Sequence, residues 1–336
     1  PLAAQLPGEL ATKMNKMYAG AFAFYRGTAH LFYQDMLTLP ASAYLNTATR
    51  STWLVGDLHA QNLGGTRDSS GNYVYSVSDF DESDWGPWTW DIRRMAVSII
   101  LAAREQGLSS TDQQAAVSAF LDGYFNKLND FKGTNDELSY RLTSANTSGV
   151  VKDIIQKSEG DSRANLLTKY TSLNTSGLRQ FTTTADMQTV TTSTLSAIQT
   201  AVSGYISTIA SSKRYATSYY TVKDARLKLG SGVGSLGRYR YYLLLEGPTS
   251  SQSDDVIVVM KQETSSAVAI ANPSGLPASS YASHHGARAA KSMKAGLTNT
   301  DVLVGYATMN GLHFLLREKT PYDEDMDTTL LSTAGK

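Results

Sequence analysis

Two short acidic motifs constrain this chain more than any other feature of its sequence. Residues 56–62 read Gly-Asp-Leu-His-Ala-Gln-Asn, so that four residues separate Asp57 from Asn62. The second motif, residues 79–81, reads Asp-Phe-Asp and ends a stretch from residue 73 whose β-branched and aromatic residues predict a strand. Residues 51–59 also predict a strand. Because both motifs lie at the ends of predicted strands, a shared site is favoured over two isolated turns.

The residue types in these motifs fit phosphoryl transfer. That reaction needs positioning and charge neutralisation more than covalent help from the protein. Asp57 is our candidate for the carboxylate that receives the proton of an acceptor hydroxyl. Asn62 and Asp79 are candidate ligands of Mg²⁺, a hard cation that prefers oxygen ligands. Asp81, at the same strand end, is a candidate ligand of a second metal ion.

A glycine-rich turn and a lysine follow in the second half of the chain. Residues 230–237 read Gly-Ser-Gly-Val-Gly-Ser-Leu-Gly between predicted strands at 223–229 and 238–246. Glycine permits positive φ and close backbone approach, which suits a loop that covers phosphate groups. The next apolar strand, residues 256–261, ends at Lys261. We therefore predict that Lys261 contacts the phosphates of a nucleotide, together with Gly230, Gly232, Gly234 and Gly237 of the turn.

These motifs together resemble the active site of protein kinases, which contains the same D-x-x-x-x-N spacing, glycine loop and strand lysine. In kinases the loop and the lysine come first, whereas here they follow the acidic motifs. The resemblance implies an α+β, protein-kinase-like fold of two lobes on a circularly permuted chain. It divides the chain into a helical catalytic lobe (1–215), a β-rich phosphate-binding lobe (216–320) and an acidic tail (321–336), which we expect to be loose.

The glutamate that a kinase lysine pairs with is not evident in the sequence. The helix predicted over residues 285–295 contains Gly286, Ala287 and Arg288 but no glutamate. Glu263 is near Lys261 in sequence, but we expect it to point to the other face or to leave the strand. For Arg94, on a predicted helix, we expect a supporting ion pair with a carboxylate such as Asp84 or Asp91.

Helical periodicity is clearest within residues 22–36 and 90–105 and around residues 195–209, where apolar residues recur at three- and four-residue intervals. The stretch from about 143 to 190, rich in Ser, Thr and Asn, has the weakest pattern. We expect long loops there.

Composition narrows the possible classes of function. Of 336 residues, 41% are hydrophobic and 18% are charged, as in a globular chain long enough for two lobes. Thirty basic and thirty acidic residues cancel, which argues against nucleic acid or an anionic membrane as the main partner. There is no cysteine, which excludes disulfides and cysteine nucleophiles, and the longest apolar run (96–103) is too short to span a bilayer. This composition favours an exported or periplasmic bacterial protein over a cytoplasmic one and leaves the compartment open.

The residues that surround the motifs carry a second resemblance. Segments 56–62, 78–82 and 86–94, with Phe24-Tyr25-Arg26-Gly27 upstream and Lys261-Gln262-Glu263 downstream, are similar to an uncharacterised bacterial family catalogued as "domain of unknown function 2252". The same elements look like those of aminoglycoside and choline phosphotransferases. That resemblance implies Asp57 as the base, Asn62 and Asp79 as metal ligands, and Asp91 as a support of the catalytic loop.

The sequence thus predicts an ATP- and Mg²⁺-dependent phosphotransferase that acts on a hydroxyl of an unknown small-molecule or protein substrate. A transferase of AMP on the same fold is an alternative. A pseudokinase that serves as a binding or scaffold protein is another, favoured by the missing glutamate. A metal-dependent hydrolase using Asp57, His59, Asp79 and Asp81 would leave the glycine loop and Lys261 without a role.

Overall fold

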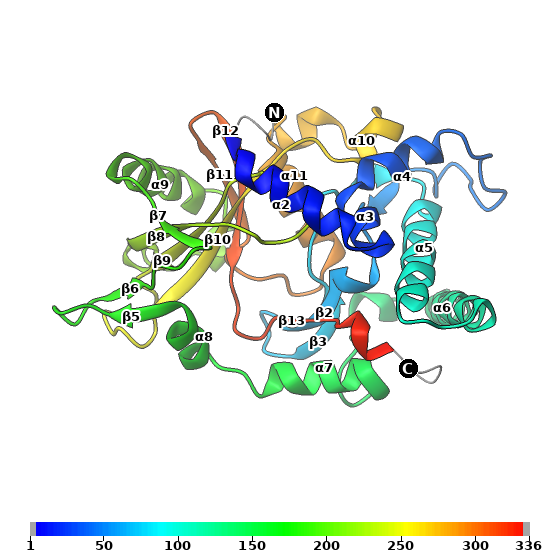
Figure 1. Cartoon of the computed structure of the whole chain (residues 1–336), viewed down its shortest axis with the longest axis horizontal. Coiled ribbons are helices and arrows are strands. Elements are labelled where there is room, and N and C mark those ends of the chain that lie inside the picture. Colours follow the sequence, from blue (N-terminus) through cyan, green and yellow to red (C-terminus); the bar gives the residue numbers. More distant parts are fainter. Residues whose placement is uncertain (1–4, 332–336) are drawn as a thin grey trace.

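A six-stranded antiparallel sheet is the largest element of this α+β protein (Figure 1). The computed structural model describes residues 5–331. The strands of the sheet, in spatial order, are β11 (Gly305–Met309), β12 (Leu312–Glu318), β10 (Val256–Glu263), β9 (Arg240–Leu245), β8 (Val222–Lys228) and β7 (Met187–Thr189). The two central strands, β9 and β10, are almost wholly buried, which explains why they are continuous apolar runs without alternation.

The main core lies between this sheet and helix α9 (Thr192–Ile206). Successive side chains of a strand point to opposite faces, and Val258 and Met260 of β10 pack toward α9. Val259 and Lys261 point to the other face, where they line a cleft. The sheet therefore has one face that forms a core and one that is partly open for a ligand.

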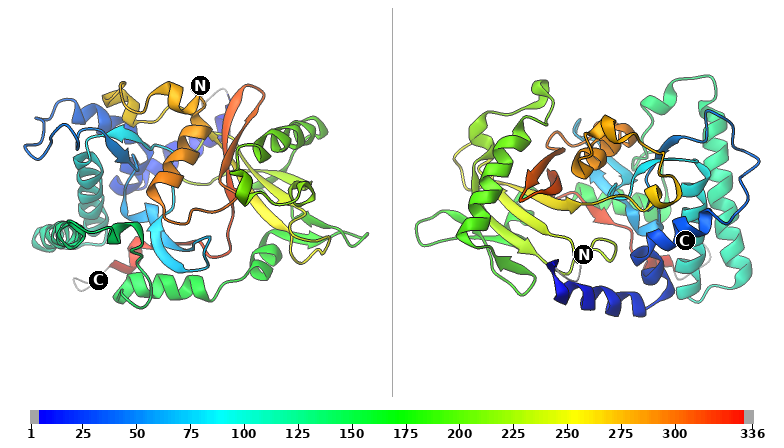
Figure 2. Two further views of the ribbon diagram at one scale, coloured as in Figure 1. Left: turned by 180° about the vertical axis from the view of Figure 1, so that it is seen from behind. Right: turned by 90° about the horizontal axis from the view of Figure 1, so that it is seen from above.

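A helical part lies beside the sheet (Figure 2). Its helices are α2 (Pro7–Tyr18), α3 (Ala21–Gly27), α4 (Ala29–Met36), α5 (Thr89–Glu105) and α6 (Ser110–Phe131). They confirm the helices predicted within 22–36 and over 90–105. Within the described residues, no helix has the length and apolarity needed to cross a membrane.

Two small sheets carry the acidic motifs. Strands β1 (Thr52–Leu54) and β4 (Asp84–Gly86) form one pair, and β13 (Glu324–Asp325), β2 (Leu63–Arg67) and β3 (Tyr73–Val77) form the other sheet. Because β13 pairs with β2, the expectation of a loose tail is wrong for this part of the chain. Residues 332–336 of the predicted tail lie outside the described residues.

The expectation of long loops between residues 143 and 190 is also wrong. This stretch forms α7 (Gly149–Glu159), α8 (Arg163–Tyr170), β5 (Thr171–Leu173), β6 (Arg179–Phe181) and β7. Each element is short and shows a polar surface, but a few buried side chains anchor it, such as Ile155 of α7 and Leu167 of α8. Helices α8 and α9 pack on the six-stranded sheet and β7 is its edge strand, although all three elements precede residue 216.

The helix predicted over 285–295 is α11 (His285–Gly296), and a single turn, α10 (Val268–Ala271), precedes it. Helix α11 packs between β12 and the Asp-Phe-Asp motif, with Ala289 and Met293 in contact with Phe80 and Leu315 in one buried cluster. Short 3-10 helices complete the chain: η1 (Ala60–Asn62), η2 (Asp136–Leu138), η3 (Ser211–Lys213), η4 (Thr217–Tyr220), η5 (Ala278–Tyr281) and η6 (Thr328–Leu331).

Candidate active site

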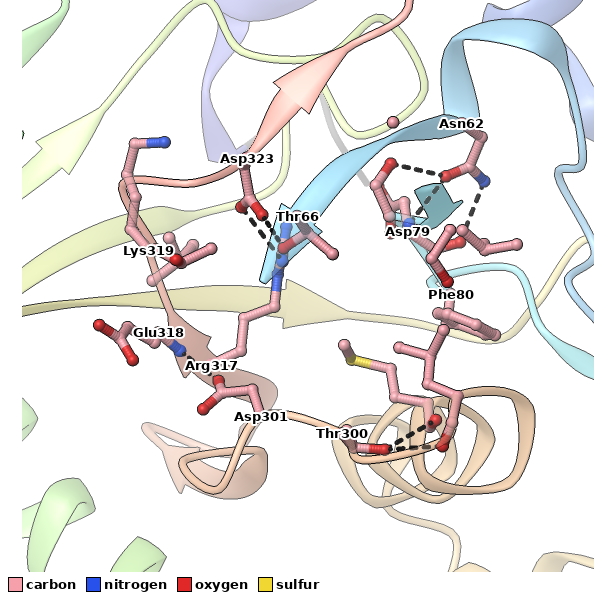
Figure 3. A pocket seen from close by; sticks show the side chains of 18 of the residues that line it. Asn62, Thr66, Asp79, Phe80, Thr300, Asp301, Arg317, Glu318, Lys319 and Asp323 are labelled. Carbon is pink, nitrogen blue, oxygen red and sulfur yellow. Dashed lines mark hydrogen bonds and ion pairs between the residues drawn. The ribbon is translucent and has the colours of Figure 1, made fainter. Parts of the chain in front are cut away.

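A cleft of about 740 Å³ separates the six-stranded sheet from the β2–β3 hairpin. Its lining is rich in both acidic and basic side chains and includes Asp57, Asn62, Asp79, Asp81 and Lys261. Figure 3 shows Asn62 and Asp79 on one side of this space and Arg317 and Asp323 on the other. The structure therefore gathers the predicted catalytic, metal-binding and lysine positions around one cavity, although they are up to 204 residues apart in sequence.

The backbone before Asp57 is held in a fixed turn. Gly56 has a φ of +84°, a conformation that only glycine adopts readily. The Asp91 carboxylate accepts hydrogen bonds from the amides of Val55 (2.7 Å) and Gly56 (3.1 Å). This contact confirms the supporting role expected for Asp91. Tyr33 donates a further hydrogen bond to the Gly56 carbonyl oxygen at 2.5 Å.

Asp57 is oriented by a buried arginine. The fully buried Arg94 donates to Asp57 Oδ1 from Nε at 2.8 Å and also from its Nη2. Arg94 thus forms the expected supporting ion pair with a carboxylate, but its partner is Asp57 and not Asp84 or Asp91, because α5 directs the guanidinium at the loop of residues 56–62. The second oxygen, Oδ2, lies 3.7 Å from His59 Nε2. Arg94 therefore holds one oxygen of Asp57, and the other makes no hydrogen bond within the described residues.

His59 is a neutral member of this loop. Its Nε2 accepts a hydrogen bond from Arg26 Nε at 3.3 Å, and its ring packs edge-on against Phe22. Burial lowers the pKa of His59 to about 4, although the Asp57 charge acts in the opposite direction. Its Nε2 lone pair is used by Arg26, whereas its Nδ1 is buried and has no hydrogen-bond partner among the described residues.

Asn62 connects the two acidic motifs. Its Oδ1 accepts hydrogen bonds from the Asp79 amide (2.7 Å) and the Ser78 hydroxyl (3.1 Å). Its Nδ2 donates to the backbone carbonyl oxygens of Asp57 (3.1 Å) and Asp79 (3.0 Å). The spacing of Asp57 and Asn62 therefore has a structural reason, because the Asn62 side chain joins the segment that carries Asp57 to the segment that carries Asp79. Its predicted part in metal binding stays a prediction.

Lys261 reaches across the cleft to both carboxylates of the Asp-Phe-Asp motif. Its Nζ lies 2.8 Å from Asp79 Oδ2 and forms a second ion pair with Asp81. The Asp79 side chain is 46% exposed, whereas that of Asp81 is 8% exposed. Burial raises the pKa of Asp81 to about 6, with the neighbouring Asp79 charge adding to it. Desolvation acts against ionisation of Asp79 too, but Lys261 brings the pKa of that carboxyl well below its ordinary value.

Glu263 shares the face of the sheet on which Lys261 lies. Strand β10 continues to Glu263, and residues two apart in a strand point the same way. The expectation that Glu263 points away is therefore wrong. Neither carboxylate oxygen of Glu263 has a hydrogen-bond partner among the described residues. Burial, with the Asp81 charge nearby, raises the pKa of Glu263 well above its ordinary value, against the opposing charge of Lys261.

Arg288 occupies the part of α11 where a glutamate was sought. Its fully buried guanidinium donates to the carbonyl oxygens of Asp81 (2.7 Å) and Thr264 (3.0 Å), and also to that of Ser83. Helix α11 thus holds the backbone of the second acidic motif and makes no ion pair with Lys261. The Asp-Phe-Asp motif is thus held by Asn62 at Asp79 and by Arg288 at Asp81.

The glycine loop lies over this constellation. Gly230, Gly232 and Gly237 all have positive φ, of 73°, 63° and 95°. Gly234 is at the tip, where a β-carbon would lie 3.8 Å from Asp57 Oδ2. Gly232 and Gly234 line the cleft, whereas Gly230 and Gly237 are not part of the lining and shape the ends of the loop.

Arg26 and Arg240 both line the cleft and make no ion pair within the described residues. Sequence reasoning missed Arg240, which is a basic residue close to the glycine loop. The spacing of the motifs did not indicate that its side chain faces the site. Within residues 5–331, no three side chains of His, Asp or Glu converge closely enough to hold a metal ion by themselves.

Comparison with known proteins places the chain in a family. Residues 5–336 match the family model described as "Uncharacterized protein conserved in bacteria (DUF2252)". The chain belongs to this family. A search of curated proteins and a search of solved structures each found no match. The DUF2252 family has no assigned function in its description, so function must be argued from the residues of the cleft.

Proposed function

We propose that this DUF2252 protein is an ATP- and Mg²⁺-dependent phosphotransferase with a circularly permuted, kinase-like arrangement. The observation that carries the proposal is the contact of Lys261 with Asp79, at 2.8 Å, beside a catalytic loop that Asn62 ties to the same aspartate. A strand lysine, a metal-binding aspartate and a loop aspartate with a downstream asparagine are the parts that kinases use.

The order of elements in the sheet supports the proposal. The glycine loop joins β8 to β9, Lys261 lies on the next strand, and helix α11 follows before β11 and β12. In kinases the glycine loop likewise precedes a lysine on the third strand and a helix. Here the loop and lysine belong to the second half of the chain and the acidic motifs to the first half, so the lobes would be joined in permuted order.

In the proposed reaction, the acceptor hydroxyl oxygen attacks the γ-phosphorus of ATP, the bond to the β–γ bridging oxygen breaks, and ADP leaves. The hydroxyl proton passes to Asp57, whose Oδ2 is left open by the Arg94 contact at Oδ1. Arg94 and the Asn62 hydrogen bonds fix the direction of this carboxylate, which is how a positioned base contributes to rate.

The carboxylates of the second motif fit a magnesium ion. Asp79 is exposed to the cleft, and Asp81 Oδ1 is a buried oxygen without a hydrogen-bond partner among the described residues. These oxygens, with the Asn62 amide oxygen, would hold Mg²⁺, which keeps several of its ligands from water and phosphate. The ion would neutralise charge on the phosphate oxygens. For Asn62 to take part, its side chain would have to release the Asp79 amide.

A pseudokinase is the second candidate, and two observations favour it. Helix α11 presents Arg288 and no glutamate to the site, and the tip of the glycine loop at Gly234 lies against Asp57. A protein of this kind would bind nucleotide without transferring a phosphoryl group.

The test is calorimetric titration of ATP, with and without Mg²⁺, into the wild type, Asp79→Asn and Asp323→Asn. Asp323 lines the same cleft and undergoes the same charge change, but it contacts Thr66 and Arg317 instead of Lys261. We expect Mg²⁺-dependent binding that Asp79→Asn removes and Asp323→Asn retains. A wild type that binds no nucleotide with or without the ion would overturn the proposal.

Turnover separates the remaining candidates. Analysis of products after incubation with ATP and an acceptor panel distinguishes ADP, which marks phosphoryl transfer, from pyrophosphate, which marks transfer of AMP. Asp57→Asn should abolish either product while leaving nucleotide binding in place. Nucleotide binding without any product across the panel would favour the pseudokinase.

A further inference from the structure

The positive charge of Lys261 is already matched by two carboxylates. Its Nζ forms ion pairs with both Asp79 and Asp81, and its side chain is 9% exposed. ADP and ATP carry about three and four negative charges on their phosphates, and a lysine held between two aspartates offers little net positive charge to them. Another cation should therefore face the phosphates under the glycine loop.

Arg240 lies directly beside Lys261. Strands β9 and β10 pair antiparallel, with Arg240 opposite Lys261 in the register, so both side chains point to the same face. Both also line the cleft. Within the described chain, no carboxylate lies within ion-pair distance of Arg240, and its one side-chain hydrogen bond goes from Nη2 to the Ser235 hydroxyl at 3.1 Å.

The guanidinium lies underneath the glycine loop. A β-carbon at Gly232 would lie 3.9 Å from Arg240 Nη2 and 3.4 Å from Ser235 Oγ. In the part of the chain that the structure describes, the amides of residues 231–237 donate no hydrogen bond. The loop residues that line the cleft, which are Ser231, Gly232, Gly234 and Ser235, lie beside the Arg240 guanidinium. Backbone N–H groups and arginine both bind phosphate oxygens, so this arrangement provides the two components of a phosphate site.

Given the proposed phosphotransferase function, on which this rests, we infer that Arg240 is the principal phosphate-binding cation of the cleft. It would hold the phosphate chain of a nucleoside di- or triphosphate against the loop amides and the Ser235 hydroxyl. Lys261 would mainly hold the two aspartates in position. Affinity for a nucleotide should therefore rise with its number of phosphates, and that increase should depend on Arg240.

The experiment is calorimetric titration of AMP, ADP and ATP, with Mg²⁺, into the wild type, Arg240→Gln, Arg240→Lys and Arg67→Gln. Arg67 is a matched control because it lines the cleft without a carboxylate partner in the described residues and stacks over Tyr73 and Tyr322. Removing a hydrogen bond to a charged group should weaken ADP and ATP binding roughly 10- to 100-fold, with AMP affected less. Arg240→Lys should recover part of the loss, and Arg67→Gln should bind like the wild type.

Two results would overturn the assignment of Arg240. One is ADP binding by Arg240→Gln at wild-type affinity. The other is an equal loss of nucleotide affinity in Arg240→Gln and Arg67→Gln, which would indicate that only the overall positive electrostatic potential of the cleft contributes to binding. If the wild type binds no nucleotide, the proposed function fails, and inorganic pyrophosphate then serves as the probe. Weaker pyrophosphate binding by Arg240→Gln than by Arg67→Gln would uphold the anion site, and equal binding by both would reject it.

Discussion

Lys16 of helix α2 donates a hydrogen bond from its Nζ to the carbonyl oxygen of Gly230, 2.7 Å away and 214 residues later in the chain. Lys13 donates in the same way to the Gly234 carbonyl oxygen at 3.0 Å, and Glu9 accepts the Gly230 amide at 2.8 Å. These three α2 residues are spaced by four and three positions, which places them on one face of the helix. Helix α2 therefore holds the glycine loop at its start and at its tip.

Removing the contacts of α2 with the glycine loop should make this loop more mobile. In the double variant Glu9→Ala/Lys16→Ala, we expect faster hydrogen exchange at the amides of residues 231–237. The free energy of unfolding should change by less than about 1 kcal/mol, because the contacts are near the surface. Lys132→Ala, at an exposed position without a side-chain hydrogen bond in the described residues, is the control. Unchanged exchange in the loop would show that α2 does not restrain it.

The Arg94–Asp57 pair should dominate the stability of the loop of residues 56–62. Arg94→Met leaves the Asp57 carboxylate without its buried partner, and breaking such a pair costs about 3–5 kcal/mol. Adding Asp57→Asn should recover part of this cost, since no unpaired charge then remains. Urea unfolding of the two single variants and the double variant measures the coupling.

Arg93→Met is the matched control for this cycle. Arg93 is the neighbour of Arg94 on α5, but its only side-chain contact of this kind in the described residues is with Met36 Sδ at 3.9 Å. Arg93→Met should lower the free energy of unfolding by less than about 1 kcal/mol. If the effects of Arg94→Met and Asp57→Asn on the free energy of unfolding are additive in the double variant, the two side chains are not coupled. Asp57 would then be oriented by other contacts.

Glu263 should make the protein less stable at alkaline pH. Its folded pKa is raised well above 4.5, chiefly by burial, so the unfolded state releases this proton more readily. The stability that Glu263 contributes is fully present below pH 4.5 and is lost as the pH rises toward the folded pKa, by about 1.4 kcal/mol per pH unit. Glu263→Gln mimics the protonated form and escapes this loss.

Urea unfolding at pH 5 and pH 8 tests whether Glu263 destabilises the protein as the pH rises. The free energy of unfolding of Glu263→Gln should be close to that of the wild type at pH 5 and larger than that of the wild type at pH 8. Glu137→Gln, at an exposed position, should give the same difference from the wild type at both values. A Glu263→Gln variant that is less stable at pH 8 would mean that the charged carboxylate is held by Lys261 and the arginines around it.

The sequence indicated the elements of this fold where a pattern was long and regular. Helices α5 and α11 and strand β10 were predicted because their apolar residues repeat over more than five positions. Strand β2 was missed because it reads Leu-Gly-Gly-Thr-Arg and has no apolar alternation. Gly64 of this strand is needed because β13 pairs closely with β2: a β-carbon at Gly64 would lie 2.3 Å from the Glu324 carbonyl oxygen.

The candidate site was predicted in its residue types but not in its connections. Motif spacing pointed to Asp57, Asn62 and Asp79, because those residues are close in sequence and their geometry is local. The contact of Lys261 with Asp79 joins residues 182 apart, and that of α2 with the glycine loop joins residues more than 200 apart. No local pattern encodes such pairs, because they depend on how the sheet and the helices pack.

Gly56 provides a direct test of the turn that precedes Asp57. A β-carbon at this position would lie 1.9 Å from the Glu82 carbonyl oxygen, and the residue has a φ of +84°. Gly56→Ala should therefore force the first acidic motif away from the second and cost roughly 3–5 kcal/mol. Gly123→Ala, in the middle of α6 with nothing within 4 Å, should instead stabilise by about 0.5–1 kcal/mol because alanine favours a helix. Chemical unfolding of both variants measures the contrast, and an equally stable Gly56→Ala protein would show that the two motifs are not in contact through this turn.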